Sequence, residues 1–231
     1  MGAVDQTHVA LVDDEDIPKC FQVLSESFGH DAPFVDIYFP NHDTSVGRIQ
    51  GSKRLATWKN TSKNSTFLKA VTRVDQKNYV PEELIIGLAV WTHMKDPPPA
   101  ELEKAENVEE VWPNGEDREF MTRLWRDYVK PRTQEVNDSG GRGVNVLELL
   151  AVHPDHQRLG AGRALVEWGT RAADELAIKA VVEGTPVGRR LYEKCGLRVE
   201  IEEMQFDTGE EYAERKKPKL LFMTREPEAE L

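Results

Sequence analysis

The sequence predicts an α/β protein in which a mixed sheet is flanked by helices. Two apolar runs of strand length, 66–75 and 83–94, are separated by a short polar turn, as in an antiparallel pair. From Val144 onward, strand-length and helix-length segments alternate, which is typical of strands joined by helices. The 231 residues are enough for one large domain with a buried core, so we expect a single domain over 1–231.

The first 94 residues are expected to contain three strands and two helices. His8–Val12 is the first strand, and a helix follows it to about Phe28, with Pro18 tolerated in the first turn. Residues 31–44 carry two prolines and three aromatic side chains, which predicts a loop with an aromatic inner face. A second helix is expected at 46–59, before the antiparallel pair.

Residues 95–143 interrupt this pattern with a 49-residue insertion that begins with three prolines and ends in NDSGGRG. Long insertions in compact domains are commonly lids or surface decoration, and we expect a lid built around one or two amphipathic helices. Between Asp96 and Glu119, nine acidic residues stand against two basic ones. That balance attracts a cation if the segment borders a site; the alternative is a solvated helix surface.

The second half of the chain carries the tightest pattern. Val144–Val152 is apolar on both faces apart from Asn145 and Glu148, as expected of a central strand. The later elements are expected to be a helix at 160–176, a strand at 180–183, a helix from Thr185 to about Gly196, and strands at 198–206 and 219–225.

A glycine loop follows the central strand in the segment His153–Val166, HPDHQRLGAGRALV. A P-loop is excluded because Arg163 stands where that motif requires Lys. A dinucleotide-binding fingerprint is excluded because Leu165 replaces its third Gly or Ala, and Ala180 stands at the place of its acidic residue.

The loop keeps the features of an anion site. The amides of Arg158, Gly160, Gly162 and Arg163 at the start of a helix form a concave nest with partial positive charge. Glycines also let a ligand approach the backbone, so we expect a pyrophosphate here. The alternative is an ordinary strand-to-helix turn whose glycines serve close packing.

Composition excludes several classes of protein. The formal net charge of −11 argues against nucleic acid as a partner, and no stretch approaches the roughly 20 apolar residues of a membrane span. Cys20 and Cys195 cannot form a disulfide framework and have no metal-ligand spacing. His153 and His156 lack further ligands nearby in the sequence, so we expect no metal. A cytoplasmic monomer or homodimer is expected.

Two motifs resemble those of the GCN5-related N-acetyltransferases, the GNAT family. Gln157-x-x-Gly160-x-Gly162 resembles the family's Q/R-x-x-G-x-G/A signature. Further on, LYEKCGL at 191–197, which follows the short strand, resembles the family's tyrosine-bearing helix, which ends in Gly-Phe or Gly-Leu. The specific resemblance covers about residues 144–200.

The resemblance implies a GNAT fold with a strongly bent mixed sheet and an acetyl-CoA-binding core at 144–200. The helical insertion at 95–143, between strands three and four, and the Glu183-Gly184-Thr185 junction depart from the family's pattern. Acetyl-CoA is the expected cosubstrate. Its thioester would enter where the two central parallel strands splay apart, and its pantetheine arm would pair with the backbone of Leu150, Ala151 and Val152. The residues expected at its pyrophosphate are Gln157, Arg158, Leu159, Gly160, Ala161, Gly162 and Arg163.

The resemblance also implies direct attack of a primary amine on the thioester, with no covalent enzyme intermediate. The ammonium, with a pKa of about 10.4, must lose a proton, and the thiolate, about 8.5, should regain one. Tyr192 resembles the family's thiolate-protonating tyrosine; the alternative is a buried structural tyrosine. Glu148 is the first candidate base, because desolvation raises a carboxyl pKa. The alternatives are a Glu148 paired with an arginine or ending a strand, Glu183 as the base, or a water chain.

The acceptor is expected to be a small-molecule amine with an apolar body. The candidate substrate-binding residues are Phe34, Tyr38, Trp91 and Glu183, since aromatic faces hold apolar bodies and ammonium groups alike. Tyr128 is one of several aromatic residues in the insertion, some of which can line a pocket. The alternatives are acetylation of a protein lysine or N-terminus, and a catalytically silent acyl-CoA-binding module.

Overall fold

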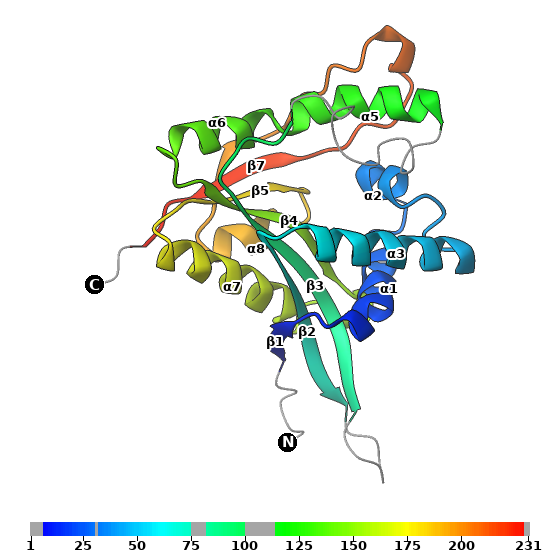
Figure 1. Cartoon of the computed structure of the whole chain (residues 1–231), viewed down its shortest axis with the longest axis vertical. Helices are drawn as coiled ribbons and strands as arrows, with labels where there is room; N and C mark the ends of the chain where they lie inside the picture. Colours follow the sequence, from blue (N-terminus) through cyan, green and yellow to red (C-terminus); the bar gives the residue numbers. More distant parts are fainter. Residues whose placement is uncertain (1–6, 31, 75–81, 100–113, 229–231) are drawn as a thin grey trace.

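The structure, a computed structural model, describes residues 7–30, 32–74, 82–99 and 114–228. Seven strands form one sheet in the order β1-β2-β3-β4-β5-β7-β6 (Figure 1). The strands are β1 His8–Leu11, β2 Ser65–Val74, β3 Glu82–Met94, β4 Val144–Val152, β5 Ala180–Gly184, β6 Arg198–Ile201 and β7 Leu221–Arg225. The helices are α1 Ile17–Phe28, α2 Pro33–Tyr38, α3 Ser45–Thr61, α5 Gly115–Tyr128, α6 Lys130–Asp138, α7 Ala161–Glu175 and α8 Arg189–Lys194.

The sheet is divided at its centre. Among the described strands, every neighbouring pair is antiparallel except β4 and β5, which are parallel. These two strands pair only at Asn145–Ala180 and Val146–Val181 and then separate. Beyond Val146, the edge of β4 that faces β5 has no strand beside it in the described part of the chain, while its other edge stays paired with β3.

Helices cover both faces of the sheet (Figure 1). α7 and α8 pack on one face, where Trp91, Leu165 and Tyr192 share an apolar cluster. On the other face, α1 and α3 cover one end and α5 and α6 the other. Successive side chains of β3 alternate between the layers, so Trp91 faces α7 while Leu88 and Val90 face α1.

A β-bulge occurs in β4 at Glu148. Trp91 lies opposite Leu147 and Val90 lies opposite Leu149, so Glu148 is the extra residue between two paired positions. Bulges bend a strand and re-aim the side chain beside them. Here the re-aimed side chain is a carboxylate, placed just where β4 leaves β5.

The predicted fold class and the order of elements are confirmed, with local differences. Residues 31–44 were expected to be a loop, but they contain α2, which starts at Pro33, because a proline is favourable in a first helical turn. The strand predicted at 198–206 ends at Ile201, and the helix after β5 begins at Arg189, after a turn. The insertion contributes α5 and α6; its residues 100–113, with most of the acidic excess, lie outside the described residues.

None of the helices in the described residues is long and apolar enough to span a lipid bilayer.

Candidate active site

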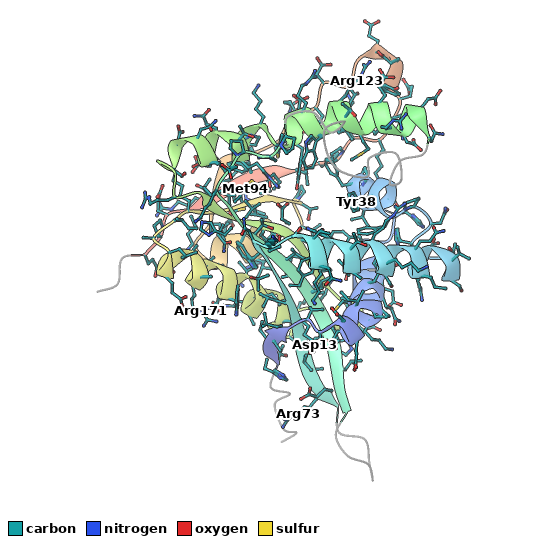
Figure 2. The ribbon with its side chains drawn as sticks, in the orientation of Figure 1. Asp13, Tyr38, Arg73, Met94, Arg123 and Arg171 are labelled. Carbon is teal, nitrogen blue, oxygen red and sulfur yellow. The ribbon has the colours of Figure 1, made fainter. Side chains whose placement is uncertain are left out.

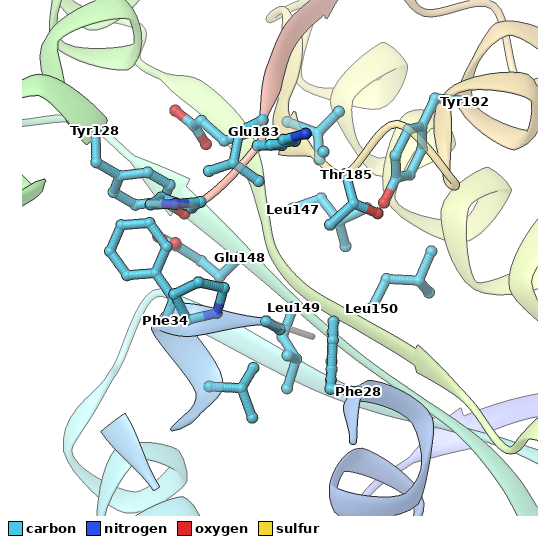
Figure 3. A pocket seen from close by; sticks show the side chains of 18 residues that line it. Phe28, Phe34, Tyr128, Leu147, Glu148, Leu149, Leu150, Glu183, Thr185 and Tyr192 are labelled. Carbon is cyan, nitrogen blue, oxygen red and sulfur yellow. The ribbon is translucent and has the colours of Figure 1, made fainter. Parts of the chain in front are cut away.

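A cavity of about 150 Å³ lies where β4 and β5 have separated (Figure 3). Its walls come from both strands, from the end of α1, from α2, from Tyr128 at the end of α5, from α8 and from the segment before β7. Glu148 and Leu150 face it from β4, Glu183 from β5 and Tyr192 from α8. The division of the sheet therefore brings several of the predicted site residues to one place.

One end of the cavity is aromatic. The ring centroids of Phe34 on α2 and Tyr128 on α5 lie 4.7 Å apart, and the ring centroids of Phe34 and Phe206 lie 6.4 Å apart. In Figure 3, Phe34 and Tyr128 lie beside Glu148, away from Tyr192. An acceptor entering at this end would meet aromatic faces and a carboxylate together.

Arg132 joins the two strands across this end. Its guanidinium donates from Nε to Glu183 Oε1 (2.9 Å) and from Nη2 to Glu183 Oε2, which makes a bidentate pair. Nη1 donates to Glu148 Oε2 (2.8 Å), and Nη2 also reaches the hydroxyl of Tyr128 (2.9 Å). Arg132 is 1% exposed and lies over the Tyr128 ring, 4.7 Å from its centroid. Glu148 is therefore paired with an arginine, which was one of the expected alternatives to its role as the base.

The electrostatics of this group follow from burial. Burial raises the pKa of Glu183 and that of Tyr128. Burial alone would lower the pKa of Arg132, but the charges of Glu148 and Glu183 outweigh it and raise that pKa. One guanidinium faces two carboxyl groups, so one negative charge is left unbalanced whenever both are ionised. In that state a cationic group in the cavity is favoured.

Tyr192 lies at the opposite end of the cavity (Figure 3). Two glycines beside it, Gly184 and Gly188, make room for its ring. A Cβ on Gly184 or Gly188 would come within 2.5 or 2.6 Å of the ring. Burial raises the pKa of Tyr192 well above the usual value of about 10. The phenol therefore stays protonated across the physiological pH range.

The glycine loop is exposed and strongly turned. Arg158 and Gly160 have positive φ angles of 66° and 93°, and Leu159 is 55% exposed. The first backbone hydrogen bond of α7 runs from Ala164 N to Gly160 O (2.9 Å). The amides of residues 161–163 precede it at the positive end of the helix dipole, as an anion site requires.

Two of the four predicted substrate-binding residues lie outside the cavity walls. Trp91 is 1% exposed and packs under α7, where its Nε1 donates to Leu165 O (3.1 Å) and its ring fills the space left by Gly169. We therefore withdraw it as an acceptor residue. Tyr38 is half-buried on α2 (Figure 2), and burial raises its pKa, with Glu148 contributing.

The main residue that sequence reasoning missed is Arg132. It lies in the insertion, and nothing in the spacing of the sequence connects it with Glu148 or Glu183, which are 16 and 51 residues away. A buried arginine in a polar helix has no local signature, because its partners come from other elements. Tyr128 was named only among several aromatic residues of the insertion.

Residues 128–198 match the family model described as an acetyltransferase (GNAT) domain. The match begins at Tyr128 and includes Arg132, β4, the glycine loop and Tyr192. No curated protein sequence matches the chain.

Several solved structures are similar over nearly the whole chain. The polyamine N-acetyltransferase of Drosophila melanogaster is 14% identical, with 95% of this chain and 98% of that chain covered and a TM-score of 0.62. The histone acetyltransferase HPA2 and related acetyltransferase of Corynebacterium glutamicum is 17% identical, with 97% of this chain and 98% of that chain covered and a TM-score of 0.60. The yncA protein of Salmonella typhimurium, determined with its cofactor acetyl-CoA, is 13% identical, with 98% of this chain and 96% of that chain covered and a TM-score of 0.52. At these identities the likeness shows the fold.

The seven-stranded sheet, divided between β4 and β5, and the matched domain define the GNAT class of fold. Residues 128–198 thus match an acetyltransferase (GNAT) domain, and the whole fold is shared with solved acetyltransferases.

Arg132→Met should destabilise the protein by about 3–5 kcal/mol at pH 7, because it leaves two carboxylates in a buried place without their cation. Without Arg132, the folded-state pKa of Glu183 lies further above its unfolded value of about 4.3–4.5. The loss should therefore grow as the pH rises above that value and should be smaller at pH 5. Urea unfolding at both pH values measures this.

Lys130→Met is the matched control for Arg132→Met, since Lys130 is exposed on the same helix. Its effect should stay within about 0.5 kcal/mol. A loss below about 1 kcal/mol for Arg132→Met, equal at pH 5 and pH 7, would show that the pairing contributes little.

Proposed function

We propose that the protein transfers an acetyl group from acetyl-CoA to the primary amine of a small cationic molecule with an apolar body. The observation that carries this is a single cavity between two separated strands, with a protonated phenol at one end and aromatic rings with excess carboxylate at the other. Direct transfer needs these two ends on opposite sides of one reacting carbonyl.

The coenzyme half of the site is built from backbone. Residues 144–200 supply the unpaired edge of β4, at Leu150, Ala151 and Val152, and the loop Gln157–Arg163. The edge offers hydrogen bonds to the amides of a pantetheine arm, and the start of α7 offers amides to a pyrophosphate. The fold shared with yncA, which was determined with its cofactor acetyl-CoA, supports the same use here.

The acceptor half is built from side chains. Phe34 and Tyr128 supply apolar and cation-binding faces, and the surplus negative charge of Glu148 and Glu183 attracts an ammonium group. The Drosophila relative in fold is a polyamine N-acetyltransferase, which agrees with this class of acceptor.

Two residues have proton-transfer roles in this proposal. Arg132 engages Oε2 of Glu148, and Glu148 uses Oε1 to orient the ammonium and accept its proton, directly or through a water. The neutral amine forms the C–N bond, the C–S bond breaks, and the thiolate takes the phenolic proton of Tyr192. The second proton of the amine restores Tyr192 through solvent. Glu183 positions Arg132, and through Arg132 it positions Glu148.

The test is a side-by-side assay of free CoA thiol release with polyamines, aryl-alkyl amines, amino acids, aminoglycosides and histone-like peptides at low salt. We expect the small cationic amines to give the highest kcat/KM, because charge and aromatic faces recognise them together. If peptides prove to be the best substrates, the proposed acceptor class, a small cationic amine, is wrong. Uniform inactivity with intact acetyl-CoA binding would favour the silent binding module.

Arg163→Glu should weaken acetyl-CoA binding about tenfold at low salt, with a smaller effect at high salt, because it reverses a charge beside the expected phosphates. Calorimetry measures the dissociation constant. Arg171→Glu is the matched control: Arg171 lies on the exposed side of α7 (Figure 2), and both arginines stand four residues before a glutamate. Equal effects of the two changes would remove the loop from the coenzyme site.

Tyr192→Phe should lower kcat about 100-fold while leaving the acetyl-CoA dissociation constant within about twofold, since the ring stays and the proton is lost. Because the pKa of Tyr192 is raised, wild-type kcat should not fall between pH 7 and 9 through ionisation of this group. Tyr212→Phe, a buried tyrosine in a different apolar cluster, is the control. Full activity of Tyr192→Phe, with chemistry rate-limiting, would leave Tyr192 a packing role.

A further inference from the structure

A second cluster of ionisable side chains lies where α1, α2 and α3 meet. His30 follows α1, Asp36 lies on α2, and His42 precedes α3. Asp36 Oδ1 is 2.8 Å from His30 Nδ1 and 3.4 Å from His42 Nε2. One atom from each residue lies within 4.8 Å of the other two, so two imidazole rings converge on one carboxylate oxygen.

The orientation of the buried His42 ring follows from Ser25. Ser25 Oγ donates its hydrogen to the His42 carbonyl oxygen (3.0 Å) and lies 2.8 Å from His42 Nδ1. Since a hydroxyl has one hydrogen, Nδ1 is the donor in the second contact. Nε2 of a neutral His42 then carries a lone pair that faces the oxygen of Asp36. Two electron-pair donors that face each other in this way suit a cation between them.

His30 is arranged in a similar manner. Its Nδ1 faces Asp36, and its Nε2 lies 3.4 Å from Asp43 Oδ2. A histidine that binds a metal through one ring nitrogen commonly donates its other N–H to a nearby acceptor, which fixes the ring. Asp43 provides that acceptor for His30, and Ser25 provides it for His42.

We propose that His30 Nδ1, Asp36 Oδ1 and His42 Nε2 form a binding site for a divalent transition-metal ion, with zinc as the best fit. Two imidazoles and a carboxylate are ligands that zinc takes, and water can complete the tetrahedron. With zinc–ligand bonds of about 2.0–2.1 Å, tetrahedral ligand atoms lie about 3.3–3.4 Å apart. The His42–Asp36 pair already has this spacing, and the His30 ring, 64% exposed, can move outward to reach it.

A serine-nucleophile role for the same residues does not fit. Ser25, His42 and Asp36 are in the order of a nucleophile, a base and an acid. Ser25 is 3% exposed, however, and its hydrogen is held by the His42 carbonyl. A substrate cannot reach this hydroxyl, which argues against a nucleophilic role for Ser25.

A metal here would tie α2 to the ends of α1 and α3. α2 lies between α3 and α5 in Figure 1 and carries Phe34, and Phe28 at the end of α1 is also a cavity wall. The ion would be structural. It would hold α1 and α2, which carry the cavity residues Phe28 and Phe34, without touching the groups that we propose react. The expectation of no metal rested on the pair His153 and His156, whereas these ligands come from three separate segments.

The test uses the full-length protein, treated with chelator and then titrated with ZnCl₂ by calorimetry and with CoCl₂ by visible absorption. We expect one zinc per chain with a dissociation constant at or below about 1 μM, and the intense cobalt bands of a tetrahedral site. His30→Gln, at an exposed position, should weaken zinc binding at least about 100-fold and abolish the cobalt bands. Asp43→Asn should weaken zinc binding about tenfold.

His8→Gln is the control, since it removes an exposed imidazole from the edge strand β1 and should leave zinc binding unchanged. Wild-type protein that binds zinc no more tightly than His30→Gln overturns the site, as do cobalt bands that persist in that variant. The probe is the metal alone, so the result does not depend on acetyl transfer.

Discussion

The candidate site depends on one buried cation, Arg132. Beyond Val146, no backbone hydrogen bonds hold β4 to β5, and two carboxylates, Glu148 and Glu183, point toward the gap. The guanidinium of Arg132 hydrogen-bonds both carboxylates, so one side chain connects the two strands beyond the point where their pairing ends. A buried pair of this kind adds little net stability but costs much to break, because a lone buried charge is so unfavourable.

This arrangement makes the insertion part of the site. Residues 95–143 were expected to cover the cavity as a lid. Their described part supplies the Tyr128 ring to the cavity wall and Arg132 to the carboxylates of Glu148 and Glu183. In the proposed function, the coenzyme half relies on backbone groups, which a short glycine motif can position. The proposed acceptor half relies on side chains from α2, α5, β4 and β5, which meet only in the folded chain. That difference explains why the coenzyme is easier to infer than the acceptor.

The part of the cavity wall that carries Phe34 is a short helix, α2, in a less regular part of the fold. α2 has six residues, too short to be stable alone, and it is held by the Phe34–Tyr128 contact and by the group around Asp36. Arg54 on α3 adds a hydrogen bond to the Tyr38 carbonyl (2.6 Å). The ring of Phe34, which we propose to contact the amine, is thus carried on a short helix that is held partly by polar contacts, and changes in these contacts should affect the acceptor end of the cavity without disturbing the sheet.

The sequence by itself determined the fold class, the bounds of β4 and the glycine loop, because strand periodicity and helix-start chemistry are local properties. Glu148 and Tyr192, which the sequence and its family resemblance singled out as candidate catalytic groups, both line the cavity. Only the tertiary structure decided that Arg132 joins Glu148 to Glu183, that Trp91 packs under α7, and that the strands separate after Val146. Each of these needs residues distant in the chain to meet, and their side chains carry no local pattern that records the partner.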